Sequence, residues 1–289
     1  MLNDEIIPHW VIPWPVKPDP YMDEFPEFRT RRRHKVPKEK KCQRFKLTIS
    51  YDGTNYAGWQ FQDDTLPTLQ GTCEKVLSKL FEQPVRVNGS GRTDSGVHAR
   101  GQVASFEVET RMEPGAILRA CNAMLPQDIR VLKAERAGEK FHAQFDAKRK
   151  EYRYFIWNDA IMPPEKRLYH THAPKPFDLA AMQKAAKHFV GEHDFCAFTA
   201  NPQRDVKNTV RKIFLCEVKK TGKLFTVRVQ GSGFLYKMVR SISGFLMRVG
   251  EGNESPDAAL ALLGEAAKRT ARVPSASPRG LFLWRVWYK

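Results

Sequence analysis

Residues 213–249 read IFLCEVKKTGKLFTVRVQGSGFLYKMVRSISGFLMRV, and this stretch predicts two strands followed by a helix. Strand-like runs at 213–218 and 224–230 are joined by a turn that contains Gly222. The apolar residues that follow recur at helical spacing and share one face: Leu235, Met238, Val239, Ile242, Phe245, Leu246 and Val249. The stretch therefore predicts a hairpin and a long amphipathic helix.

The segments on either side of this stretch complete a repeating unit. Before it come a strand-like run at 151–157 and a helical stripe of Leu179, Met182, Ala185, Ala186 and Phe189. After it, Ser255-Pro256 is expected to start a short helix that ends at Gly264, and a last strand is expected at 281–287. The order is β-α-β-β-α-β, with one extra helix, which is a split βαβ unit.

The earlier part of the chain repeats the same order. Residues 45–51 alternate like a strand, and Thr68 is placed to cap an amphipathic helix. Pro114 is expected to open a second helix, and three further strands are expected at 85–87, 103–108 and 129–134. We therefore predict an α+β fold of two tandem ferredoxin-like halves, residues 45–147 and 148–289, which form one extended mixed sheet with a central cleft.

Composition restricts the partners and the compartment. The 289 residues carry a formal net charge of +16, which is typical of a protein that binds a polyanion such as nucleic acid. No run of about 18 apolar residues predicts a membrane helix, and the acidic start does not resemble a signal peptide. The five cysteines are scattered and form no CxxC pair. We expect a cytoplasmic protein with free thiols.

Residues 1–44 differ in composition from the rest and are predicted to be a disordered extension. Residues 1–28 hold six prolines and six acidic residues, whereas residues 29–46 hold ten Lys or Arg and one Glu. Two interpretations are open: a solvated tail, or a basic arm that grips phosphate while the acidic part shields it.

The segment NGSGRTDSGVHAR, residues 88–100, holds the residues best suited to chemistry. It is too long for a tight hairpin, and its glycines bound a loop that places Asp94 among arginines. A dinucleotide-binding GxGxxG motif would need glycine at Asp94, and a P-loop would need lysine at Val97. The alternatives are an ordinary glycine-rich loop, in which Asp94 bonds its own backbone, and a catalytic loop.

The nine residues 91–99, GRTDSGVHA, resemble the signature of TruA-type tRNA pseudouridine synthases. The resemblance runs from about residue 45 to residue 289 and includes further segments: YDGTNYAGWQ at 51–60, FHAQF at 141–145, EYRY at 151–154, GFLYKMVR at 233–240 and Gly280-Leu281. It implies two ferredoxin-like halves, no cofactor or metal, a homodimer, and tRNA as partner. The implied reaction converts uridine to pseudouridine in the anticodon stem-loop, at positions 38 to 40.

The resemblance also implies roles for single residues. It makes Asp94 the essential nucleophile or base, because moving the sugar from N1 to C5 of uracil needs a carboxylate at the sugar–base junction. Attack at C1′, attack at C6 and removal of a ribose proton remain open. Arg240 is implied to pair with Asp94. Its position opposite the apolar stripe of its helix also fits an ordinary solvated face.

Three more residues complete the expected site. Tyr152 matches the tyrosine that packs on the flipped uracil, although Tyr152 and Tyr154 share one strand face and alternation does not separate them. Arg92 resembles the residue that enters the RNA helix and holds the flipped nucleotide, and Leu281 resembles an apolar contact to the pocket.

Other polar residues receive more general roles. His98 is expected to be structural, and the spacing of His170, His172, His188, His193 and Cys196 fits no standard zinc site. A scattered set of cations is expected to contact the tRNA backbone: Lys148, Arg149, Lys150, Arg153, Lys207, Arg211, Lys212, Lys219, Lys220 and Lys223.

Two other classes of protein are alternatives to the enzyme. A non-catalytic RNA-binding module would show an RNP-type aromatic run, and none is present in the sequence. A glycoside hydrolase acting on nucleic acid would need paired carboxylates, whereas the loop at 88–100 offers Asp94 alone.

Overall fold

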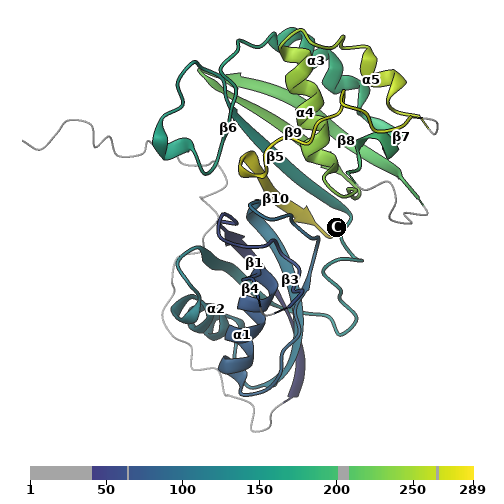
Figure 1. Cartoon of the computed structure of the whole chain (residues 1–289). Helices are drawn as coiled ribbons and strands as arrows, with labels where there is room; N and C mark the ends of the chain where they lie inside the picture. The colour runs from purple at the N-terminus through teal and green to yellow at the C-terminus, as the bar shows by residue number, and fades with distance from the viewer. Residues whose placement is uncertain (1–40, 64, 201–207, 265–266) are drawn as a thin grey trace, which may run out of the picture. The chain divides into compact units, whose positions relative to one another are not determined.

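The computed structural model describes residues 41–63, 65–200, 208–264 and 267–289 (Figure 1). Most of the predicted extension, residues 1–40, lies outside the described residues. The first strand, β1 (Lys41–Tyr51), begins at Lys41, ahead of the strand start predicted at residue 45.

The described strands form one ten-stranded sheet in the order β4-β1-β3-β10-β5-β9-β8-β7, with two short strands, β2 and β6, paired to β3 and β5. The pairs β3–β10 and β5–β6 are parallel and the other pairs are antiparallel. The α+β class and the extended mixed sheet are therefore confirmed. The strands after β1 are β2 (Asn88–Gly89), β3 (His98–Thr110), β4 (Ile129–Ala137), β5 (Arg149–Trp157), β6 (Thr171–His172), β7 (Gly191–Asp194), β8 (Val210–Thr221), β9 (Leu224–Gly231) and β10 (Leu281–Trp287).

The strand order has the same form in both parts of the sheet. In the first part β4, β1 and β3 are neighbours and β2 pairs with the far edge of β3; in the second part the order is β10-β5-β9-β8. Each part thus places its last strand beside its first, as a split βαβ unit does. This order supports the division into two ferredoxin-like halves, which stays a prediction. The two parts meet where β10 runs parallel to β3, with Phe282 opposite His98.

The helices lie against the sheet in two groups. In Figure 1, α1 and α2 lie beside β1, β3 and β4, whereas α3, α4 and α5 lie beside β5, β8 and β9. The predicted cap is confirmed, since the Gly71 amide donates to the Thr68 hydroxyl at 3.1 Å. No helix of the described residues is long and apolar enough to cross a membrane. The helices are α1 (Leu69–Phe81), α2 (Pro114–Met124), α3 (Leu179–His188), α4 (Met238–Gly250) and α5 (Ala258–Ala261).

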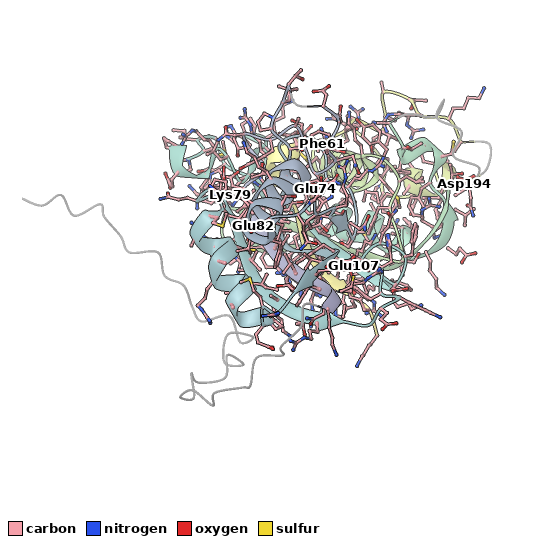
Figure 2. The ribbon with its side chains drawn as sticks, turned by 90° about the horizontal axis from the view of Figure 1, so that it is seen from below. Phe61, Glu74, Lys79, Glu82, Glu107 and Asp194 are labelled. Atoms are coloured by element: carbon pink, nitrogen blue, oxygen red, sulfur yellow. The ribbon has the colours of Figure 1, made fainter. Side chains whose placement is uncertain are left out.

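The strand predicted at 85–87 is wrong, because α1 takes its backbone hydrogen bonds. The Val87 amide donates to the Glu74 carboxylate at 2.9 Å, and the Val85 amide donates to the Ser78 hydroxyl at 2.9 Å. Figure 2 shows Glu74 on α1, the helix whose side chains make these bonds. With their amides taken by α1, these residues do not join the ladder, and pairing begins at Asn88.

Two predicted helix starts are also wrong. The backbone from Ser255 first forms a turn, in which the Ala258 amide donates to the Ser255 carbonyl at 3.1 Å, so α5 begins only at Ala258. Leu235 is buried but precedes α4, because Lys237 adopts a left-handed conformation with φ of 58° and the helix begins at Met238.

Candidate active site

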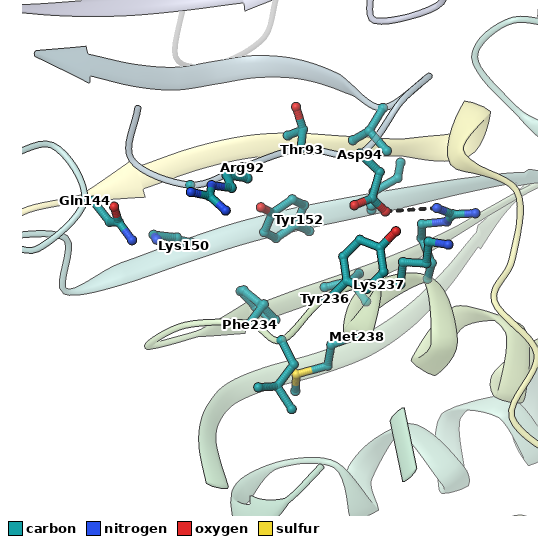
Figure 3. Close-up of a pocket in the computed structure, with 16 residues that line it drawn as sticks. Arg92, Thr93, Asp94, Gln144, Lys150, Tyr152, Phe234, Tyr236, Lys237 and Met238 are labelled. Atoms are coloured by element: carbon teal, nitrogen blue, oxygen red, sulfur yellow. Dashed lines mark hydrogen bonds and ion pairs between the residues drawn. The ribbon is translucent and has the colours of Figure 1, made fainter. Parts of the chain in front are cut away.

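A cavity of about 450 Å³ lies where the two parts of the sheet meet, and it gathers all five predicted site residues (Figure 3). The loop after β2 contributes Arg92 and Asp94, β5 contributes Tyr152, α4 contributes Arg240, and the first residue of β10 is Leu281. The cavity is in the size range of small-ligand pockets, which suits one flipped nucleotide. The central cleft expected from the sequence is thus present as this cavity.

The loop that carries Asp94 is held by one backbone bond and one side-chain bond from residues 51–59. The Trp59 amide donates to the Thr93 carbonyl at 3.0 Å, and the Tyr51 and Thr93 hydroxyls are 2.8 Å apart. Within the loop, the Val97 amide donates to the Asp94 carbonyl at 3.1 Å. The Asp94 side chain is therefore carried by a backbone that is bonded on both sides of it.

Gly58 permits this close approach of the two backbones. Its φ is +102°, and a Cβ added there would lie 2.6 Å from the Thr93 carbonyl oxygen. Both the conformation and the contact exclude a side chain. The segment YDGTNYAGWQ, whose role the sequence left open, thus serves to position the Asp94 loop.

Asp94 and Arg240 form the ion pair that the resemblance implied. The Arg240 Nη1 donates to Asp94 Oδ2 at 2.9 Å, across 146 positions of the chain. The Arg240 Nε donates to the Ala276 carbonyl at 2.7 Å, so both edges of the guanidinium are fixed. The side chains are 11% and 21% exposed, which leaves the carboxylate accessible from the cavity.

The polar face of α4 is not solvated, so the alternative for Arg240 is wrong. Ser241 is fully buried, and Arg269 donates to its hydroxyl at 2.9 Å. A Cβ added at Gly244 would lie 2.2 Å from the Pro274 carbonyl oxygen. The segment around residues 269–276 therefore covers this face and supplies the Ala276 carbonyl that holds Arg240.

The structure separates the two tyrosines that share a strand face. Tyr152 lines the cavity and meets the Phe234 ring edge-on, with centroids 5.1 Å apart. Tyr154 is fully buried, and its hydroxyl bonds to the Ser277 carbonyl at 2.9 Å and to Thr171. Burial, with a smaller contribution from the charge of Asp94, raises the pKa of the Tyr152 phenol. The phenol is therefore neutral at physiological pH and keeps a proton to donate.

Two further predicted residues lie at opposite ends of the burial range. Arg92 is exposed at the mouth of the cavity, where its Nε donates to the Gln60 side chain at 2.9 Å. Leu281 is buried at 6% exposure and pairs with Tyr154 on β5. An exposed cation and a buried apolar side chain suit the contacts implied for them.

Several residues that line the same cavity were not predicted from the sequence. Phe234, Tyr236 and Lys237 come from the segment before α4, which the sequence treated only as part of a helix. A visible signal was the pair of aromatic residues, Phe234 and Tyr236, inside the GFLYKMVR motif. Gln144 comes from the FHAQF motif, for which no role was assigned.

The charge in the cavity is strongly positive. Among the described residues that line it, Arg92, Lys150, Lys237 and Arg240 are cationic, and Asp94 is the single carboxylate. Glycoside hydrolysis needs two carboxylates across the bond that is cleaved, so this arrangement disfavours it. The cations instead suit a polyanionic substrate, and the single carboxylate suits a reaction that uses one carboxylate of the protein.

His98 lies outside the cavity lining, in the join between the two parts of the sheet. It is fully buried, its Nε2 is 3.0 Å from the Leu168 carbonyl, and its Nδ1 is 3.1 Å from the Gly53 amide and from Asp52. Burial lowers the pKa of its imidazole, although Asp52 partly counteracts this. These contacts fit the structural role expected for it.

The histidines considered for zinc have other partners. His170 and His172 contact backbone carbonyls, and His188 pairs with Asp257.

Comparison with known proteins yields one family. Residues 47–146 and 185–289 match the family model described as tRNA pseudouridine synthase. The chain is 43% identical over 244 residues to tRNA pseudouridine synthase A of Methylacidiphilum infernorum, covering 84% of this chain and 95% of that protein. It is 44% identical over 246 residues to tRNA pseudouridine synthase A of Geotalea uraniireducens, covering 85% of this chain and 100% of that protein.

These matches define an RNA-modifying isomerase, and the cavity described above is basic and holds one carboxylate. Most of the chain aligns with nearly the full length of the relatives. The chain belongs to the tRNA pseudouridine synthase family, the enzymes that convert uridine in tRNA to pseudouridine.

Proposed function

We propose that this chain isomerises uridine to pseudouridine at positions 38 to 40 of the tRNA anticodon stem-loop, with Asp94 as nucleophile or base. The observation that carries the proposal is the Asp94–Arg240 ion pair, at 2.9 Å, inside a basic cavity of a chain of this family. The choice of positions rests on the resemblance of the GRTDSGVHA segment and its companions to TruA-type enzymes.

The reaction breaks the bond from N1 of uracil to C1′ and forms a bond from C5 to C1′. The proton on C5 leaves and N1 gains a proton, so the product is an isomer of the substrate. No net oxidation or reduction takes place, and the chemistry asks for no redox cofactor. Asp94 supplies the carboxylate at the sugar–base junction, and Arg240 orients it through the 2.9 Å ion pair.

Tyr152 provides the surface for the base. A flipped uracil loses its stacking neighbours, and an aromatic face in the cavity replaces them. The edge-on contact with Phe234 fixes the orientation of the Tyr152 ring. The neutral phenol is suited to assist the proton transfer at C5, while Leu281 closes the apolar side of the cavity.

Arg92 holds the nucleotide in the flipped state. It lies on the same loop as Asp94 and is exposed, so an RNA helix has access to its guanidinium. Its hydrogen bond to Gln60 keeps the side chain directed at the mouth of the cavity.

We also propose that the chain acts as a homodimer in the cytoplasm, as the resemblance implies.

The test is tritium release from anticodon stem-loops labelled at C5 of uridine. Conversion displaces the hydrogen from C5, so release reports the reaction directly. Stem-loops that keep uridine at one of positions 38, 39 or 40, with cytidine at the other two, identify the positions used. No release from any of them, by a protein that modifies uridine elsewhere in whole tRNA, would contradict the proposed site.

A further inference from the structure

Lys150 lines the cavity, and its ammonium is bonded to a backbone carbonyl. It stands two residues before Tyr152 on β5, and its Nζ donates to the Ser90 carbonyl at 2.5 Å. No carboxylate of the described residues lies within ion-pair distance of this ammonium, although the neighbouring Glu151 pairs with Arg153 and Arg228. One carbonyl satisfies one of its three donors, so two N–H groups remain available.

The surroundings of Lys150 disfavour its charge. Burial lowers the pKa of the Lys150 ammonium. A partly buried cation that lacks an anionic partner is unfavourable, and an anion placed beside it stabilises the charged form. Asp94 is already paired with Arg240, so within the described part of the chain no carboxylate is left for Lys150, and a ligand can supply the anion.

The position of Lys150 indicates which part of a nucleotide it meets. Along this face of β5 the exposure falls from the partly buried Lys150 to Tyr152 at 8% and Tyr154 at 0%. In Figure 3, Lys150 lies with Arg92 and Gln144 on one side of Tyr152, and Asp94, the partner of Arg240, lies on the other. Since Arg92 and Gln144 are exposed, Lys150 belongs to the mouth of the cavity.

A flipped nucleotide enters base first, so its sugar–phosphate backbone stays at the mouth. Uracil and ribose are neutral, and phosphate is the anionic group that RNA offers. Gly91 leaves the approach open, since a Cβ added there would lie 3.4 Å from Lys150 Nζ and 4.0 Å from the Tyr152 hydroxyl.

We propose that Lys150 binds one of the two phosphates that flank the target uridine, and thereby holds the flipped nucleotide at the mouth of the cavity. This proposal rests on the proposed function. It gives Lys150 a role distinct from the general backbone contacts of surface cations such as Lys148.

The experiment neutralises the phosphate and the lysine separately and together. Anticodon stem-loops carry a methylphosphonate 5′ or 3′ of the target uridine, and they are offered to wild type, Lys150→Met and Lys148→Met. Single-turnover rates at increasing enzyme concentration give the half-saturating concentration. Lys148 is exposed and does not line the cavity, so Lys148→Met is the matched control.

With wild type, we expect one of the two methylphosphonates to raise the half-saturating concentration about tenfold. Lys150→Met should raise it about tenfold with unmodified RNA, show no further loss with that methylphosphonate, and lower the slope of log affinity against log salt by about 1. Lys148→Met should keep the methylphosphonate effect, and Lys150→Arg should restore wild-type behaviour. Thermal melting verifies that each variant is folded. If Lys150→Met is not folded, Lys150→Gln replaces it in the same experiment.

Additive losses at both linkages, or a wild type that is indifferent to both methylphosphonates, would overturn the assignment. The second outcome needs no variant and therefore does not depend on folding. Failure of wild type to convert the unmodified stem-loop would instead contradict the proposed function, so the two failures are distinguishable.

Discussion

Asp94 and Arg240 reach the same cavity from two regions that are held in different ways. The Asp94 loop is fixed by the Trp59–Thr93 backbone bond, by the Tyr51–Thr93 hydroxyl contact and by a glycine where the chains touch. Arg240 is fixed through its side chain, which is anchored at Nε by Ala276 and at Nη1 by Asp94. The first region therefore depends on a close backbone approach at Gly58, whereas the second depends on the geometry of the guanidinium.

The largest effect is expected for Asp94→Asn. The amide keeps the size of the side chain but loses the charge and the nucleophilic or basic oxygen, so turnover should fall by about 10³-fold or more. The backbone bonds of the loop do not involve this carboxylate, so the melting temperature and tRNA binding should stay near wild type. Single-turnover tritium release with parallel binding measures both. Turnover within about tenfold of wild type would contradict the assignment of Asp94.

Arg240→Lys tests whether the site depends on the geometry of the Arg240 guanidinium. A lysine keeps the charge, but its ammonium lacks the planar fork that serves Ala276 and Asp94 together. We expect turnover to fall by about 10²-fold for Arg240→Lys and by more for Arg240→Met, because a displaced carboxylate misses the reacting atom. Arg211, partly buried on β8 and outside the cavity lining, provides an Arg→Lys control. A fully active Arg240→Lys enzyme would show that charge alone suffices.

Tyr152→Phe and Tyr154→Phe should differ in kind. Removing the Tyr152 hydroxyl keeps the stacking face, so RNA binding should persist, while turnover falls by about 10²-fold if the phenol moves the C5 proton. Tyr154→Phe loses the bonds to Ser277 and Thr171, which costs about 1–2 kcal/mol of stability with turnover near wild type. Thermal melting and single-turnover kinetics separate them. Loss of turnover in the Tyr154 variant alone would reverse the assignment.

Gly58→Ala tests whether the site depends on the close approach of the backbones at Gly58 and Thr93. The methyl group would meet the Thr93 carbonyl and require a positive φ, so we expect about 1–3 kcal/mol of destabilisation. Displacement of the loop should also reduce turnover by about tenfold. Gly222→Ala is the control: its φ is also positive, at +58°, and an added Cβ meets no described atom within 4 Å. A turnover loss equal in both variants would indicate that backbone strain, rather than the Thr93 contact, is responsible.

The smallest effect is expected from pH. Burial lowers the pKa of His98 in the folded protein, so the unfolded chain binds the proton more readily. Its contribution to stability is present above the unfolded pKa of about 6.5 and is lost as pH falls toward the folded pKa. The free energy of unfolding should therefore decrease on acidification below about pH 6.5, and less so in His98→Gln. An unchanged slope in that variant would assign the pH dependence to other groups.

Local patterns predicted most elements but not the bonds between distant segments. Thr68 and the apolar stripe after it were sufficient for α1, because a cap and a periodicity are properties of adjacent residues. The strand at 85–87 failed because its amides bond to side chains of α1, which no local pattern reveals. The cover over the polar face of α4 was equally invisible, since residues 269–276 come from elsewhere in the chain.

For the site, too, local patterns do not reveal contacts between distant segments. Asp94 stood out because a carboxylate in a glycine-bounded loop is unusual by itself. Tyr152 and Tyr154 share one face of β5, and only the structure shows that the first lines the cavity and the second bonds to Ser277. In the sequence Lys150 is one of many cations, because its place in the cavity and its bond to the Ser90 carbonyl depend on what surrounds it in three dimensions.

The position of β10 in the chain has a consequence for synthesis. This strand lies between β3 and β5, and it contributes Leu281 to the cavity, yet residues 281–287 are translated after every other described element. A ribosome has therefore produced both Asp94 and Arg240 before the strand that joins their two regions emerges. We expect nascent chains stalled before residue 281 to lack activity on tRNA, and release of the complete strand to switch it on. Modification of tRNA would then begin only with chains whose translation has passed this strand.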